Sequence, residues 1–325
     1  MEDPGPVPRP DQHSSNLNLT FDPTQPAVVA TVTILEHLFR VTLATEEGVR
    51  GDLHPRLLHD FRVSIRRTRS ILGEVKKVLP RESTKHFRRE FSWLAGTTGP
   101  TRDLDVLLIK LSGYENALPS DWKAGGKALL ALIEGQRHSA ARSLAEQLDS
   151  DRYTNLRSAW PRFLESAATQ TTEKNALRPI LQVADKRISR ARSGAVALAQ
   201  AIGPSSPESD LHRLRIACKK LRYLLEFFRS LYPVAEVSAR IGALEELQDV
   251  LGDLNDFSVQ RTLLLELTHQ QRSPNLCSGE ALVAIERLQE LLRELQGTQR
   301  QRLTRLLDGE ALTAELGATP HHESR

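Results

Sequence analysis

The chain has 325 residues, of which 39% are apolar and 26% charged, and its formal net charge is only +3. No stretch approaches the roughly 18 uninterrupted apolar residues of a membrane span, so we expect no membrane partner. Two cysteines, Cys218 and Cys277, cannot build a disulfide framework, and the first residues lack a basic-then-apolar signal pattern. We therefore expect a reduced, cytoplasmic protein.

Helical periodicity runs through almost the whole chain, and no segment shows the alternation of a strand. Prolines crowd residues 1–26, which predicts a disordered tail, and residues 309–325 are expected to form a flexible tail. Pro55 and Pro207 suit the first turn of a helix. The pattern predicts an all-α protein with helices over residues 27–48, 55–79, 81–97, 101–112, 119–149, 151–169, 174–202, 207–231, 234–251, 254–272 and 279–307.

Two of these helices carry the same basic pattern. Residues 59–69 read His-x-x-Arg-x-x-x-Arg-Arg-x-Arg, and residues 212–222 repeat this pattern with a Lys-Lys pair in the middle. The copies are separated by 153 residues, and the same separation relates residues 99–106 to residues 252–259. A constant separation across two motifs indicates an internal duplication. It predicts two pseudo-symmetric helical bundles, over residues 27–170 and 174–308.

Each copy is amphipathic. On a helix, the first, fourth, eighth and eleventh positions fall within roughly an 80° arc, and they span about 15 Å. These positions define a first basic row (His59, Arg62, Arg66, Arg69) and a second basic row (His212, Arg215, Lys219, Arg222). The opposite faces are apolar, with Phe61, Ile65, Thr68 and Leu72 in the first copy and Leu214, Cys218, Leu221 and Leu225 in the second.

Two such rows predict a site for a long, dense polyanion. Residues 212–223 hold five Lys and Arg residues and no acid, whereas residues 59–70 hold four Arg residues and Asp60. The copies also differ at matching positions, as where Asp60 stands opposite Arg213, and the second half is expected to bind more strongly. The acids gather elsewhere, mostly within residues 236–256 and 280–297.

Four stretches resemble, in the family's order, the conserved-histidine α-helical domain proteins, or CHAD family: Leu58–Leu72, Trp93–Val106, Leu211–Phe228 and Leu247–Asp256. Ile180–Arg192 fits the helix that precedes the family's second motif, and the resemblance covers about residues 27–308. It implies two four-helix bundles around a basic central cavity. It also implies non-catalytic binding of inorganic polyphosphate and localisation at polyphosphate granules.

The resemblance implies polyphosphate contacts for the basic residues of both copies, for Tyr223, and for Arg187 and Arg190 on the preceding helix. Lys186 joins them by its spacing on that helix. The candidate polyphosphate-binding residues are His59, Arg62, Arg66, Arg67, Arg69, Lys186, Arg187, Arg190, His212, Arg215, Lys219, Lys220, Arg222 and Tyr223.

These residue types suit phosphate, because arginine offers a fork of five donors and lysine a compact charge. A protonated histidine donates from both ring nitrogens, so affinity is expected to rise as the pH falls. The alternative is that the cations pair with acids of neighbouring helices, the histidines bond backbone carbonyls, and Tyr223 packs with Phe227. Asp103, Asp105 and Asp256 could bind a hard cation, but helix capping and pairing with the basic rows explain them as well. We expect no metal and no cofactor.

Two other functions stay open at this point. An RNA binder would hold the phosphate backbone, although only 5% of the residues are aromatic and could stack on bases. A metal-dependent phosphohydrolase would need a metal-activated water. Some relatives carry a triphosphate-processing domain marked by Glu-x-Glu-x-Lys, and no such string occurs here. We therefore expect no enzyme, with inorganic polyphosphate as the partner and other polyanions as further candidates.

Overall fold

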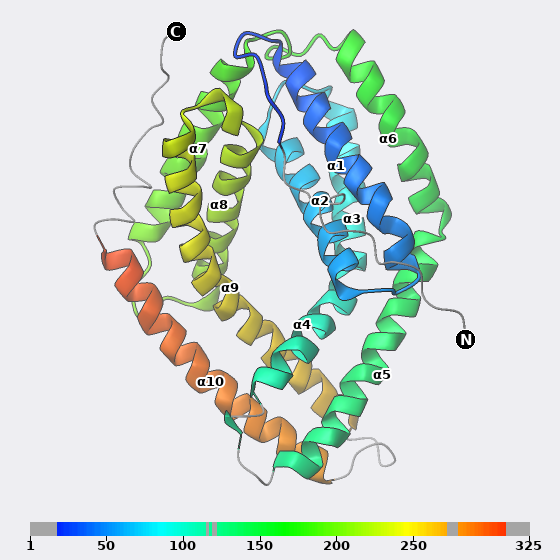
Figure 1. Cartoon of the computed structure of the whole chain (residues 1–325), viewed down its shortest axis with the longest axis vertical. Coiled ribbons are helices and arrows are strands. Elements are labelled where there is room, and N and C mark those ends of the chain that lie inside the picture. The colour runs from blue at the N-terminus through cyan, green and yellow to red at the C-terminus, as the bar shows by residue number, and fades with distance from the viewer. Residues whose placement is uncertain (1–17, 115–116, 119–121, 272–278, 310–325) are drawn as a thin grey trace. The chain divides into compact units, whose positions relative to one another are not determined.

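The computed structural model describes residues 18–114, 117–118, 122–271 and 279–309, and within these ranges it contains helices and no β-strand (Figure 1). The all-α prediction is therefore confirmed. The helices are α1 (Ala27–Arg50), α2 (Pro55–Glu74), α3 (Arg81–Thr97), α4 (Gly99–Tyr114), α5 (Trp122–Leu148), α6 (Asp151–Gln170), α7 (Ile180–Gln200), α8 (Glu208–Phe227), α9 (Val234–Gln271) and α10 (Gly279–Asp308), with a short 3-10 turn at Arg229–Leu231.

Local chemistry explains where α2 begins and ends. Pro55 occupies its first turn, and the ring nitrogen Nδ1 of His54 accepts a hydrogen bond from the amide of Arg56 at 3.0 Å. This contact satisfies one of the amides that a helix start leaves without a partner. The helix stops at Glu74, earlier than the sequence pattern predicts, and Lys77 then adopts a left-handed backbone with φ of 61°.

The prediction of two helices over residues 234–251 and 254–272 is wrong, because α9 is one continuous helix. The corresponding segment of the first copy does break, between α3 and α4 at Thr98 and Gly99. The residue after Gly99 is Pro100, which lacks the amide that an uninterrupted helix would use, whereas Asp253 follows Gly252 and keeps it.

The chain forms two compact units that interleave along the sequence. Unit 1 holds the described residues up to Gly99, Ser143–Arg187 and Tyr223–Leu231. Unit 2 holds Pro100–Arg142, Ile188–Arg222 and the described residues from Tyr232 onward. These units differ from the contiguous bundles over residues 27–170 and 174–308, and the internal duplication stays a prediction.

Unit 1 is built on α1, α2, α3 and α6, which pack against one another. The face of α2 expected to be apolar is buried, with Phe61, Ile65, Thr68 and Leu72 each less than 4% exposed. Between α3 and α6, the ring of Trp160 meets the ring of Phe91 edge-to-face at a centroid distance of 4.8 Å. This burial holds α2 with its opposite, basic face turned away from the core.

Helix α1 is long and apolar enough, by length and composition, to cross a membrane. More than half of its most apolar window is nevertheless buried inside the protein, where α1 packs against α2 and α6. The core of unit 1 therefore accounts for its apolar composition.

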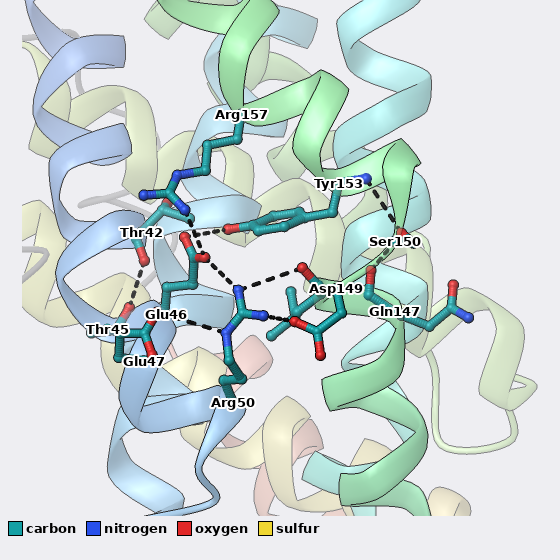
Figure 2. A network of polar contacts seen from close by, with 11 residues as sticks. Thr42, Thr45, Glu46, Glu47, Arg50, Gln147, Asp149, Ser150, Tyr153 and Arg157 are labelled. Atoms are coloured by element: carbon teal, nitrogen blue, oxygen red, sulfur yellow. Dashed lines mark hydrogen bonds and ion pairs between the residues drawn. The ribbon is translucent and has the colours of Figure 1, made fainter.

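A buried polar network joins α1 to α6 and to the segment that precedes α6 (Figure 2). The carboxylate of Glu46 is only 2% exposed, and it accepts hydrogen bonds from Arg50 at 2.8 Å, Tyr153 at 2.9 Å and Arg157 at 3.3 Å. Arg50 also pairs with Asp149. Burial and the adjacent Glu46 carboxylate raise the pKa of the Tyr153 hydroxyl far above its usual value, so this group stays a hydrogen-bond donor.

The prediction of a disordered tail over residues 1–26 is wrong for the residues that the structure describes. The side chain of Phe21 is buried, and its amide donates to Ser230 Oγ at 3.1 Å. Pro26 forms an isolated antiparallel bridge with Pro179. Burial of Phe21 and these backbone contacts attach the segment to unit 1. Residues 1–17 and 310–325, which carry the rest of the tail predictions, lie outside the described residues.

Unit 2 has its own hydrophobic core, drawn from α4, the first part of α5, α9 and α10. Helices α9 and α10 lie side by side (Figure 1). The fully or almost fully buried members of this core include Leu107, Leu129, Ile133, Leu264, Leu288 and Leu292. Helix α8 makes polar contacts within unit 2 with residues of α9.

Candidate anion-binding site

The first basic row lies on α2 in unit 1, opposite the buried face. His59 and Arg69 are exposed, and Arg62 and Arg66 are half-buried. Arg62 is held at the end of α3, where its Nη1 donates to the carbonyl of Ala95 at 3.2 Å and to Thr98 Oγ1 at 2.7 Å. The carbonyls at the end of a helix carry partial negative charge, which favours an arginine there.

A pocket of about 280 Å³ opens beside this row, between α2 and α3. The face of α3 that lines it carries small side chains, which leave the space open. No carboxylate is among its lining residues in the part of the chain that the structure describes. The lining residues are Arg62, Arg66, Arg69, Ser92, Ala95, Gly96 and Thr98.

Arg88 of α3 extends this cluster of positive charge, and the sequence pattern did not single it out. A β-carbon at Gly73 would lie only 3.6 Å from Arg88 Nη2, so the guanidinium sits against α2. Partial burial, and then the positive charges of Arg88 and Arg66, lower the pKa of Arg69. Neither Arg69 nor Arg88 has an ion pair with any residue that the structure describes. We call Arg66, Arg69 and Arg88 the arginine cluster.

The sequence of α3 contains a spacing that places Arg88 on the face that lines the pocket. Arg88, Ser92 and Ala95 follow a helical spacing of four and three residues and therefore share one face. The repeat hides this signal, because the residue 153 positions after Arg88 is Ile241.

Two predicted ligands in unit 1 occupy protected positions. Arg67 is buried and pairs with Glu226 at 2.5 Å, and its guanidinium lies 5.6 Å from the ring centre of Tyr223. Tyr223 is 3% exposed, and its hydroxyl accepts a hydrogen bond from Arg66 Nε at 2.9 Å. This contact positions the Arg66 side chain and uses one of its five N–H donors. Glu226 is an acid outside the basic pattern, so the sequence pattern did not point to it.

The second basic row lies on α8 in unit 2, and the face expected to be apolar is buried there too, at Leu214, Cys218 and Leu221. Acids and amides of α9 contact the row. His212 Nδ1 lies 3.3 Å from Asn255 Oδ1, and Arg222 Nη1 donates to Glu245 at 3.2 Å.

The remaining predicted residues vary in exposure. On α8, Arg215 and Lys219 are half-buried and Lys220 is exposed, and each of the three has interactions of its own. On α7, Lys186 and Arg190 are exposed, whereas Arg187 is half-buried and donates to the carbonyl of Lys76 at 3.4 Å. The direct phosphate contacts of all fourteen candidates stay predictions.

The aspartates near the repeated motif pair with cations of their own unit. Asp105 is 2% exposed and accepts from Arg137 Nε at 2.9 Å, and Lys110 lies 3.3 Å from Asp256. Within the described ranges, no group of three or more His, Cys, Asp or Glu side chains is arranged to hold a metal ion. Ion pairing thus explains these carboxylates. Burial raises the pKa of the Cys218 thiol to about 12, so this thiol is a core group.

Two mycobacterial proteins resemble the chain in sequence. The chain is 24% identical over 230 residues to the uncharacterized proteins MT2285 and Rv2226 of two Mycobacterium tuberculosis strains. These alignments cover 69% of this chain and 42% of each relative, so the chain spans less than half the length of those relatives.

Two solved structures resemble the fold. The CHAD domain from the plant Ricinus communis superimposes with a TM-score of 0.78 at 27% identity, covering 95% of this chain and 98% of that one. PptA from Streptomyces chartreusis superimposes with a TM-score of 0.62 at 16% identity, covering 87% and 100% of the two chains. The CHAD domain model matches residues 33–265, more than half of the sequence. The chain therefore belongs to the CHAD domain family.

Proposed function

We propose that this protein binds inorganic polyphosphate through its basic rows and does not transform it. The observation that carries the proposal is the pocket beside the first row, where arginines converge and no lining carboxylate offsets them. Repetition of the row on α8 and membership of the CHAD family support the same function.

The chemistry of the site suits a chain of phosphates. Charge-assisted hydrogen bonds to phosphate are roughly twice as strong as neutral ones. Each phosphate that an arginine or lysine neutralises releases counterions, so affinity should fall steeply as the salt concentration rises. A polyphosphate chain carries its charges in a line, which matches a row of cations about 15 Å long on one helix. We propose that each row supplies cations along which phosphates of the chain bind.

We propose binding without turnover because of the side chains that line the pocket. Phosphoryl transfer to water requires a positioned base or a metal-activated water. The residues that line the pocket supply cations, hydroxyls and small side chains. These groups hold and orient an anion. RNA would be held by its phosphates alone, as a weaker substitute, because the rows offer few aromatic surfaces.

Titration of the full chain with polyphosphate of defined length, at two salt concentrations, tests the proposal. We expect tight binding at low salt, a steep loss at high salt, and a raised melting temperature with ligand, since a ligand of the folded state stabilises it. The double variant Arg66→Glu with Lys219→Glu should abolish binding while the helical circular dichroism signal is retained. Binding of the double variant at wild-type strength would place the site elsewhere.

Two further assays separate the rival functions. Polyphosphate should displace RNA far better than RNA displaces polyphosphate, and the reverse order would favour an RNA binder. Steady release of phosphate from polyphosphate in the presence of Mg²⁺ or Mn²⁺ would show an enzyme instead. We also propose that the protein works in the cytoplasm at polyphosphate granules, which imaging of a tagged full-length chain together with polyphosphate would test.

A further inference from the structure

The two basic rows meet different chemistry on the neighbouring helix, although the repeat relates them residue by residue. The α3 residues that line the pocket beside the first row are small and uncharged. At the same separation of 153 residues, the second copy carries two carboxylates and an amide. The corresponding pairs are Ser92 and Glu245, Ala95 and Gln248, and Gly96 and Asp249.

Because of this difference, the last arginine of each row has a different neighbour. In unit 2, Arg222 is 23% exposed and donates to Glu245 at 3.2 Å. In unit 1, the equivalent residue is Arg69, which lines the pocket together with Ser92. A serine hydroxyl cannot neutralise a guanidinium, so Arg69 keeps its full charge next to Arg66 and Arg88.

We infer that the two rows are unequal: the pocket beside the first row is the dominant phosphate subsite, and Glu245 is a built-in counter-ion that weakens the second row. This inference rests on the proposed function, and it names the residues that distribute affinity within it. It reverses the expectation that the second half binds more strongly, which compared the two copies of the basic helix and left out the carboxylates of the neighbouring helix.

Electrostatics gives the direction of both effects. The arginine cluster brings three like charges together, and their mutual repulsion destabilises the empty site. A phosphate that enters the pocket relieves this repulsion, so it gains more there than beside a single cation. In the second row, a phosphate must first displace the Glu245 carboxylate from Arg222 and then remain beside that negative charge.

The exposure of Glu245 limits how much its charge can change the affinity for phosphate. Glu245 is 53% exposed, and exposed ion pairs contribute little, so its removal should raise the affinity of the second row by at most about fivefold. A carboxylate placed in the pocket of unit 1 would sit beside Arg69 and the half-buried Arg62 and Arg66, and it would compete with phosphate at the stronger subsite. We expect it to lower affinity by about tenfold.

An exchange of the two residues tests the inference in the full chain. Ser92→Glu gives the first copy the acid of the second, and Glu245→Ser gives the second copy the serine of the first. Ser92→Gln controls for the size of the new side chain. Glu246→Ser controls for net charge, because it removes the same charge from the next residue of α9. Affinity for polyphosphate of one defined length is measured at one salt concentration.

The inference is supported if Ser92→Glu weakens binding about tenfold, clearly more than Ser92→Gln does, and if Glu245→Ser strengthens binding more than Glu246→Ser does. It is overturned if the glutamate and glutamine variants at position 92 bind alike, or if the two serine variants on α9 bind alike, while wild type still binds tightly. Failure of the wild-type chain to bind polyphosphate at all would instead overturn the proposed function, and the inference with it. Thermal unfolding of each variant confirms that the fold is retained.

Discussion

The buried ion pair between Arg67 and Glu226 gives the sharpest prediction about stability. The two side chains are 7% and 17% exposed, and their charged atoms lie 2.5 Å apart. Replacing Glu226 with glutamine keeps the shape but removes the negative charge that pairs with the Arg67 guanidinium. Breaking one side of a buried pair costs about 3–5 kcal/mol, and the partial exposure of Glu226 favours the lower end, near about 3 kcal/mol.

Urea and thermal unfolding, followed by circular dichroism, measure this cost. At about 2 °C per kcal/mol for a chain of this size, the melting temperature should fall by about 6 °C. Glu290→Gln is the matched control, because it removes the same charge from an exposed pair with Arg287 and should cost less than about 1 kcal/mol. The double variant Arg67→Met with Glu226→Leu should recover most of the loss, since it removes both charges. Equal costs for the two glutamine variants would refute the reasoning.

Three further predictions concern other parts of the molecule. Arg88→Gln should lower polyphosphate affinity about tenfold, and the exposed neighbour Arg89→Gln should change it less than about twofold; equal losses in a titration would remove Arg88 from the site. Tyr153→Phe removes the hydroxyl that donates to the buried Glu46 carboxylate and should cost about 1.5–3 kcal/mol by urea unfolding, whereas a loss below about 0.5 kcal/mol would contradict a structural role for this bond. The pKa of Glu208 is lowered from its usual 4.5, chiefly by the hydrogen bond it accepts from a serine of α9. Its contribution to stability is therefore complete above pH 4.5 and is lost as the pH falls through the lowered value. The stability gap between wild type and Glu208→Gln should close over that range, and a gap that widens on acidification would contradict this sign.

The secondary structure and the direction of each basic face could be read from the sequence, because a period of 3.6 residues alone decides which residues share a side of a helix. Phe61 and Ile65 are buried opposite the first row, as the periodicity predicts, and Leu214 is buried opposite the second. The break between α3 and α4 and the continuity of α9 also have a local cause. A proline stands at position 100 and an aspartate at position 253.

The neighbours of each cation could not be read in this way, because they come from other helices. Arg67 looks like its neighbours in the basic pattern, yet its carboxylate partner, Glu226, is 159 residues away. Position 88 has no basic counterpart in the second copy, so the repeat could not point to it.

The sequence by itself determined that the chain contains the same amphipathic helix twice, because side-chain spacing along one helix is a local property. Only the tertiary structure decided which of its cations have a carboxylate beside them that offsets their charge toward an incoming anion. The effective charge of an arginine depends on what lies within a few ångströms of it. Around Arg69 and Arg88 the fold brings arginines and small side chains, and around Arg222 it brings Glu245.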